Sequence, residues 1–110
     1  MRKVYVINKG CHDLSDAEAY GELVYLSEGS INKFNTSMMY RQFFDQMKSS
    51  TKDDYILISG LTVMCCMACS IFSSLHGRVN LLLYKSSRKK KTPGYYIHRE
   101  ILIGGNENDS

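Results

Sequence analysis

The hydrophobic residues of this chain fall in short runs that are separated by polar, turn-forming residues. Runs of this length that are rich in valine, isoleucine, leucine and tyrosine are typical of buried strands. The sequence predicts five such strands, at residues 3–7, 23–26, 55–58, 78–84 and 95–103. The run at 23–26 is short, and a preceding helix could continue into it instead, so the number of strands depends on this segment.

Three helices are predicted between these strands. Ser15 and Glu18 match a capping box, which opens a short helix that reaches about residue 22. Apolar residues at i, i+4 spacing predict a second helix that ends near Lys48. Its first turn can be capped by Asn35, Thr36 or Ser37.

The third helix, at 61–75, is apolar on nearly all sides and is closed by Gly77. Such a helix is buried on several sides, and in a chain of 110 residues that favours a homodimer. Its three cysteines are Cys65, Cys66 and Cys69. They have no second Cys-x-x-Cys pair and no nearby histidine pair, so we expect reduced, packed thiols and neither a metal nor a cofactor.

This order of elements, β-α-β-α-β-α-β-β, predicts an α/β fold built as a three-layer sandwich with a mostly parallel, Rossmann-like sheet. A helix joins strands 55–58 and 78–84, so these two strands should be parallel. Strand 95–103 returns through a hairpin and becomes an antiparallel edge strand. We expect a single α/β domain at 1–104 and a polar C-terminal tail at 105–110.

The loops at 8–15, 27–35 and 59–62 all follow parallel strands, so they should share one edge of the sheet. Ligands of parallel α/β sheets bind at this edge, where helix N-termini favour anions. The predicted site holds a phosphorylated or nucleotide-type ligand on Ser59, Gly60 and Thr62, flanked by Asn8 and His12. Gly60 would let the backbone turn sharply and let a ligand come close. The alternative is an ordinary strand-to-helix turn in which Ser59 or Thr62 caps the helix.

Positive charge is concentrated in one loop. Of the 14 Lys and Arg residues, five are Lys85, Arg88, Lys89, Lys90 and Lys91, which leaves nine positive against eleven negative charges elsewhere. Because this loop follows a parallel strand, its cations can steer an anion towards the same edge. A second hypothesis is nucleic-acid binding through the 85–96 hairpin. The alternative is a solvated hairpin tip, which is the commoner explanation of a run of charges.

The sequence supports catalysis less strongly than binding. His12 and Asp13 follow the first strand and could exchange protons with a substrate, but no motif fixes a nucleophile beside them. Recognition or sequestration of a ligand therefore explains the sequence better than turnover, although the sequence does not decide whether the protein is an enzyme. A structural or interaction protein that binds no small ligand is a third hypothesis.

The segment Ile56–Val63, a strand followed by Ser-Gly-Leu-Thr and a helix, resembles the phosphate-contacting turn of CRISPR-associated Rossmann-fold sensor domains, without their fuller glycine–threonine pattern. Those domains bind cyclic oligonucleotides as dimers, so the resemblance implies a nucleotide-type ligand and a homodimer. The small size, basic loop and single α/β domain also resemble small uncharacterised bacteriophage proteins. The chain enters its first strand at residue 3 with no signal-peptide pattern and no apolar run long enough to span a membrane. We therefore expect a cytoplasmic location, in the host cell if a phage encodes the protein.

Overall fold

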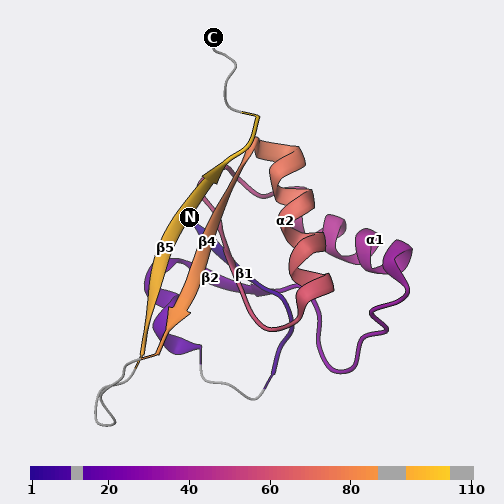
Figure 1. Ribbon diagram of the computed structural model, residues 1–110, viewed down its shortest axis with the longest axis horizontal. Coiled ribbons are helices and arrows are strands. Elements are labelled where there is room, and N and C mark those ends of the chain that lie inside the picture. Colours follow the sequence, from indigo (N-terminus) through magenta and orange to yellow (C-terminus); the bar gives the residue numbers. More distant parts are fainter. Residues whose placement is uncertain (11–13, 87–93, 105–110) are drawn as a thin grey trace.

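The computed structural model describes residues 1–10, 14–86 and 94–104, and the elements within them follow the predicted order (Figure 1). Five strands and three helical segments form in this part of the chain. They are β1 (Lys3–Val6), η1 (Ser15–Tyr20), β2 (Glu22–Tyr25), α1 (Thr36–Met47), β3 (Tyr55–Leu57), α2 (Thr62–His76), β4 (Arg78–Lys85) and β5 (Tyr95–Leu102).

The strands form one mixed sheet in the order β2-β1-β3-β4-β5. The pairs β1–β2, β1–β3 and β3–β4 are parallel, whereas β4 and β5 are antiparallel over all eight residues of each strand. The α/β class, the mostly parallel sheet and the antiparallel edge strand are thus confirmed. Residues 23–26, which the sequence left open between strand and helix, belong largely to strand β2.

Side chains on the two faces of the sheet pack against different layers, because successive residues of a strand point to opposite faces. Helices α1 and α2 lie together on one face, and η1 lies on the other (Figure 1). On the α1/α2 face, Tyr5 and Ile56 pack in one core with Phe43 and Phe72. On the η1 face, a smaller core contains Val4, Val6, Ala17, Tyr55, Leu57 and Leu82. One outer layer of the predicted sandwich is therefore a single six-residue helix.

The first predicted helix differs from expectation. It is a 3-10 helix that ends at Tyr20, its N-cap residue is Leu14, and no capping hydrogen bond from a side chain forms there. Gly21 explains the early end, since its φ is 157° and a Cβ there would lie 2.5 Å from the carbonyl oxygen of Arg2. Because Gly21 has no side chain, the backbone can pass close to Arg2. The N–H of Glu22 then donates to the Arg2 carbonyl oxygen at 3.0 Å, and β2 begins beside β1.

Both longer helices form close to their predicted limits. Of the three possible caps of α1, Asn35 is the one used: its Oδ1 accepts the N–H of Met38 at 3.2 Å. Helix α2 ends where Gly77 adopts a left-handed conformation with φ 69°, as glycine at this position commonly does. The helix buries one side, while Val63 and Cys66 on its other side are exposed, so it is not enclosed within one chain. Within the described residues, no helix combines the length and the apolarity that crossing a membrane requires.

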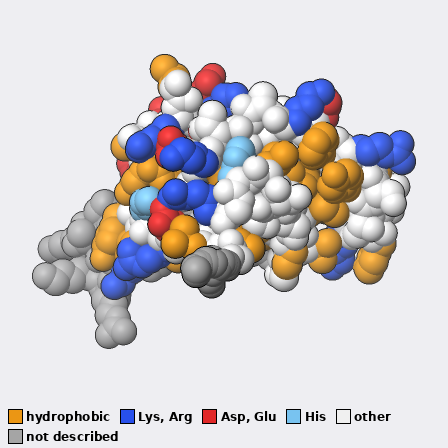
Figure 2. All heavy atoms as spheres, turned by 90° about the horizontal axis from the view of Figure 1, so that it is seen from above, with side chains coloured by type: hydrophobic (Ala, Val, Ile, Leu, Met, Phe, Trp, Pro, Cys, Tyr) orange, Lys and Arg blue, Asp and Glu red, His pale blue; other side chains and the backbone are white. Residues whose placement is uncertain are grey.

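The strand directions give the sheet two distinct edges. The amino edge is the edge at which β1, β3 and β4 begin, and the carboxyl edge is the one at which they end. Seen from the amino edge, basic and acidic side chains lie next to one another over the sheet (Figure 2).

Candidate ligand site at the carboxyl edge of the sheet

The chain leaves neighbouring strands β1 and β3 in opposite directions. After β1 it runs to η1 on one face, and after β3 it runs to α2 on the other (Figure 1). A reversal of this kind between adjacent parallel strands is the place where open α/β sheets form a ligand crevice. The predicted site lies at this edge, where β1 and β3 end side by side.

The turn after β3 is organised around Ser59. Its Oγ accepts the N–H of Leu61 at 3.4 Å and lies 3.9 Å from the Sγ of Cys65, whose thiol donates to the Ser59 carbonyl at 3.4 Å. Leu61 is the N-cap residue of α2, and no side chain of the described residues caps this helix. Thr62 is the first helical residue and is exposed. Neither Ser59 nor Thr62 is thus the helix cap that the alternative interpretation required.

Gly60 does not need glycine's conformational freedom, contrary to the expectation of a sharp glycine turn. Its φ lies outside the positive range, and a Cβ placed there would meet no atom within 4 Å. The backbone at Gly60 is therefore open to its surroundings, and a ligand could approach it closely.

Asn8 has a structural role in the described part of the chain. Its Nδ2 donates to the carbonyl oxygen of Gly29 at 3.1 Å, and its Oδ1 lies 2.9 Å from the hydroxyl of Ser27. Ser27 Oγ also donates to the Ile7 carbonyl at 2.7 Å. Asn8 thus connects the segments that follow β1 and β2 rather than presenting both polar atoms to a ligand.

The remaining predicted site residues lie outside the described residues: His12, with Asp13, falls in 11–13, and Arg88, Lys89, Lys90 and Lys91 fall in 87–93. Lys85 ends β4 at the carboxyl edge and marks the place from which the basic loop departs.

A small cavity of about 190 Å³ adjoins the first turn of α2, and we call it the α2 pocket. It is lined by Lys33 and by Gly60, Leu61, Thr62, Val63 and Met64. Lys33 comes from the segment after β2, and its ammonium nitrogen lies 5.6 Å from the centre of the Phe34 ring. A cation from one loop is therefore placed beside the N-terminus of a helix from another, which the sequence did not reveal.

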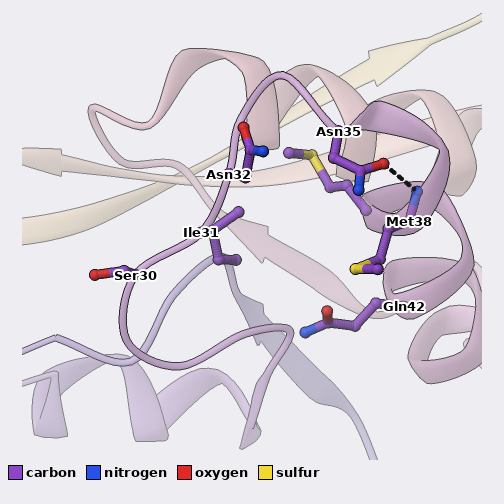
Figure 3. A pocket seen from close by; sticks show the side chains of 7 residues that line it. Ser30, Ile31, Asn32, Asn35, Met38 and Gln42 are labelled. Atoms are coloured by element: carbon purple, nitrogen blue, oxygen red, sulfur yellow. Dashed lines mark hydrogen bonds between the residues drawn. The ribbon is translucent and has the colours of Figure 1, made fainter.

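A second cavity, of about 140 Å³, lies between the segment after β2 and the start of α1, and we call it the amide pocket (Figure 3). It is lined by Ser30, Ile31, Asn32, Asn35, Met38, Met39 and Gln42. The sequence predicts Asn35 only as a possible helix cap. The one signal that could have drawn attention to this region is the concentration of asparagines at 32 and 35 after a strand that ends at the carboxyl edge.

The three cysteines of α2 differ in their exposure: Cys65 is buried, Cys69 is half-buried and Cys66 is exposed. All three are free thiols, and in the described ranges no group of three or more His, Cys, Asp or Glu side chains could hold a metal ion. Burial, followed by the nearby Cys65 and Cys66, raises the pKa of Cys69 to about 11. Its thiol is therefore protonated at neutral pH and is a poor nucleophile.

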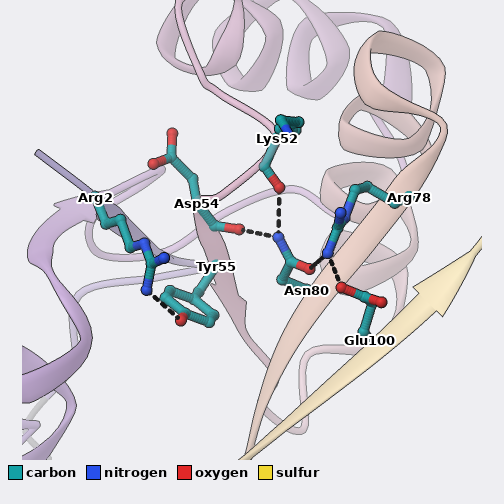
Figure 4. A network of polar contacts seen from close by, with 7 residues as sticks. All are labelled: Arg2, Lys52, Asp54, Tyr55, Arg78, Asn80 and Glu100. Atoms are coloured by element: carbon teal, nitrogen blue, oxygen red, sulfur yellow. Dashed lines mark hydrogen bonds and ion pairs between the residues drawn. The ribbon is translucent and has the colours of Figure 1, made fainter.

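The amino edge is organised differently (Figure 4). Asp54 is 1% exposed, and its two carboxylate oxygens accept the N–H groups of Lys3 at 2.9 Å and Thr51 at 2.8 Å. Asn80 donates to the carbonyl oxygens of Lys52 and Asp54, at 2.6 and 2.9 Å. Because these bonds join β1, β3 and β4 at their beginnings, the buried polar groups here hold the sheet together.

The same network continues to the edge strand. Arg78 donates to Asn80 Oδ1 at 3.1 Å and forms an ion pair with Glu100 of β5. Arg2 donates to the hydroxyl of Tyr55 at 3.3 Å. The ends of β4 and β5 are thereby fixed to the strands at the centre of the sheet.

These features define a small α/β protein with one mixed sheet, two pockets at its carboxyl edge and a hydrogen-bonded amino edge. A sequence model of the phage Pam3 gp32-like protein family matches residues 2–97, so the chain belongs to this family. The expected likeness to small phage proteins is confirmed. No curated protein and no solved structure matches the chain. The resemblance to CRISPR-associated sensor domains stays a prediction.

Proposed function

We propose that this phage-family protein binds a phosphorylated, nucleotide-type ligand at the carboxyl edge of a Rossmann-like sheet and retains it without turnover. The observation that carries the proposal is the uncapped first turn of α2, which faces a pocket that also contains Lys33. The location at a reversal of chain direction between β1 and β3 supports it independently.

The first turn of α2 has hydrogen-bond donors to offer. The first four N–H groups of a helix have no partner within it. The first hydrogen bond within α2 runs from the N–H of Cys65 to the Leu61 carbonyl, at 2.9 Å. The N–H groups of Thr62, Val63 and Met64 therefore have no backbone acceptor within the helix. Together with the helix dipole and Lys33, these donors suit a phosphate group.

Binding without turnover is favoured by the composition of the α2 pocket. Its lining contains one cation, one hydroxyl and apolar side chains, and neither a histidine nor a carboxylate is among these described residues. A general acid or base would have to come from elsewhere, for which His12 and Asp13 are the candidates from the sequence.

Native mass spectrometry of the protein purified from cells tests the proposal. We expect a co-purifying mass of nucleotide size that is released by mild denaturation. Thr62→Phe should abolish it by filling the pocket, whereas Thr36→Phe should retain it, since Thr36 is the exposed first residue of α1 and lines neither pocket. Retained binding by Thr62→Phe, or a bare protein in every preparation, would reject this site.

A second candidate function is nucleic-acid binding through the 85–96 hairpin. The observation that favours it is the exposure of Tyr84 (55%) and Tyr95 (51%) where the hairpin leaves the sheet, because exposed aromatic rings beside cations can stack on bases. Binding to a single-stranded oligonucleotide would then weaken steeply with salt, and exchanging Lys89, Lys90 and Lys91 for Gln would remove both the binding and its salt dependence.

We also propose that the free edge of strand β5 is an interaction surface that joins two copies of the protein in a homodimer. Strand β5 has one free edge in the described sheet, and Ile101, Leu102 and Ile103 at its end are exposed by 47, 65 and 47%. Analytical ultracentrifugation of the protein and of Leu102→Lys would test whether this edge joins two copies.

A further inference from the structure

We propose that the amide pocket binds the base of the nucleotide whose phosphate occupies the α2 pocket. This inference rests on the proposed function and names the part of the ligand that this second cavity recognises. It is carried by the orientation of three amide side chains, those of Asn32, Asn35 and Gln42 (Figure 3).

Hydrogen bonds to the backbone fix which way each amide points. Backbone N–H groups only donate and carbonyl oxygens only accept, so the identity of the bonded amide atom is not ambiguous. Asn35 Oδ1 accepts the Met38 N–H at 3.2 Å, and Asn32 Oδ1 accepts the Phe34 N–H at 3.0 Å. In Gln42 the amino group, and not the oxygen, bonds to the backbone, because its Nε2 donates to the Leu26 carbonyl at 3.0 Å.

The amide atoms that do not bond to the backbone include both donors and an acceptor. Asn32 and Asn35 each keep an amino group, and Gln42 keeps its carbonyl oxygen. Figure 3 shows these atoms turned towards the space between the three side chains. The pocket therefore offers two donor groups and one acceptor to whatever occupies it.

An apolar surface lies beside these polar atoms. Met39 is 3% exposed, and Ile31 packs on the same core from the segment after β2. A nucleobase has the complementary form, with flat apolar faces and an edge that carries both acceptors and amino or imino donors. Methionine sulfur also makes favourable contacts with aromatic rings. A cavity of about 140 Å³ suits a single ring system rather than a whole nucleotide.

One short segment of the chain contributes residues to both pockets. Lys33 lines the α2 pocket, while Asn32 and Asn35, its near neighbours in the chain, line the amide pocket. Both pockets therefore adjoin residues 32–35, and we expect the ribose of a single ligand to lie along this segment. A phosphate beside α2 and a base beside α1 are thus the two ends of one ligand.

Methionine residues in the two pockets allow binding of the phosphate and binding of the base to be observed separately. Met64 lines the α2 pocket, Met38 and Met39 line the amide pocket, and fully buried Met47 at the far end of α1 lines neither. We would record methionine-methyl NMR spectra and calorimetric titrations with the four nucleoside 5′-monophosphates, the matching nucleosides and ribose 5-phosphate. At least one monophosphate should shift Met38, Met39 and Met64 and leave Met47 unchanged. Ribose 5-phosphate should shift Met64 alone and bind at least tenfold more weakly.

The outcomes separate the two proposals. If ribose 5-phosphate binds as tightly as every monophosphate and Met38 and Met39 never shift, the base pocket is wrong and the phosphate site stands. If nucleosides shift Met38 and Met39 while no phosphate shifts Met64, the base pocket stands and the proposed phosphate site is wrong. If no ligand shifts any of the three methyl groups, both are rejected.

A variant of Asn35 tests the amide set without disturbing the fold. Asn35→Ser keeps a capping oxygen for α1, because serine caps as well as asparagine, and it removes the amino group that faces the pocket. Affinity for the preferred monophosphate should fall about fivefold, as expected for one neutral hydrogen bond, with no change for ribose 5-phosphate. Gln46→Ala, an exposed change on the same helix, should alter neither affinity. Unchanged affinity for all four monophosphates in Asn35→Ser would overturn the inference.

Discussion

At the amino edge of the sheet both carboxylate oxygens of Asp54 accept backbone N–H groups, whereas at the carboxyl edge no described side chain caps the first turn of α2. Both edges contain polar groups that are paired with one another, but the amino edge buries a carboxylate, whereas at the carboxyl edge the first turn of α2 faces a pocket. Buried polar groups with partners stabilise a fold, while exposed donors and acceptors without internal partners remain available to a ligand. The comparison therefore assigns a stabilising role to the amino edge and supports the proposal that the carboxyl edge binds a ligand.

Asp54→Ala should have the largest effect on stability. It would leave the buried N–H groups of Lys3 and Thr51 without acceptors, and we expect a loss of about 3 kcal/mol in the free energy of unfolding. Urea unfolding followed by circular dichroism would measure it. Asp53→Ala, at the exposed neighbouring position, should change stability by less than about 0.5 kcal/mol. Equal effects of the two variants would refute the role given to the amino edge.

A pair of glycine variants compares the edges directly. Gly21→Ala places a Cβ 2.5 Å from the Arg2 carbonyl at a φ of 157°, so we expect a loss of about 2 kcal/mol in stability. Gly60→Ala meets no atom within 4 Å and should be neutral within about 0.5 kcal/mol. Thermal unfolding of both variants gives the answer. A destabilised Gly60→Ala would show that the carboxyl edge is more constrained than we infer.

Lys33→Ala should act on binding and not on folding. Loss of the cation in the α2 pocket should weaken binding of ribose 5-phosphate about tenfold, and more at low salt than at high salt. Calorimetric titration at two salt concentrations would show this. Lys48→Ala removes another exposed lysine, which pairs with Asp45, and it should leave binding unchanged. If both variants weaken binding alike, the effect is one of net charge and not of the pocket.

The smallest effect is expected at Tyr5, which is an exception near the amino edge. Its hydroxyl is buried and has no hydrogen-bond partner among the described residues, so Tyr5→Phe should stabilise the protein by about 1 kcal/mol. Burial, followed by the Asp54 carboxylate, raises the pKa of Tyr5 to about 12 from 10.0. Because the unfolded chain loses this proton first, the free energy of unfolding should fall as pH rises from about 10 to 12.

Chemical unfolding of the wild type and of Tyr5→Phe across this pH range would test the assignment. In Tyr5→Phe the part of the alkaline decline that belongs to Tyr5 should disappear, while the part due to Cys69, which begins near pH 9, should remain. Identical pH profiles of the two proteins would show that Tyr5 does not titrate as described.

The order of elements, the parallel strands and the antiparallel edge could be predicted because each depends on local apolar runs and on the connections between them. The end of η1 at Tyr20 could not, since it depends on the close approach of Gly21 to Arg2, which are 19 residues apart in the chain. The burial of Asp54 was equally hidden, because the residue stands at the end of a polar segment and becomes buried only when Lys3 and Asn80 pack around it.

The placement of Gly60 and Thr62 at the carboxyl edge follows from the direction of the parallel strands, and both residues line a pocket. Their role in binding a ligand stays a prediction. The contribution of Lys33 and the orientation of Gln42 depend on neighbours from other elements, namely α2 and the Leu26 carbonyl. A segment without periodicity, such as 27–35, gives no local signal for such contacts.

The antiparallel return of β5 has a practical consequence for experiments. Leu102 pairs with Arg78 at the beginning of β4, and Lys3 begins β1 at the same edge, so both ends of the described chain lie opposite the two pockets. An affinity tag, a fluorophore or a biotin group attached beyond Met1 or Gly104 would leave the carboxyl edge unobstructed. Protein immobilised on a sensor surface through either end should therefore present its pockets to the solution.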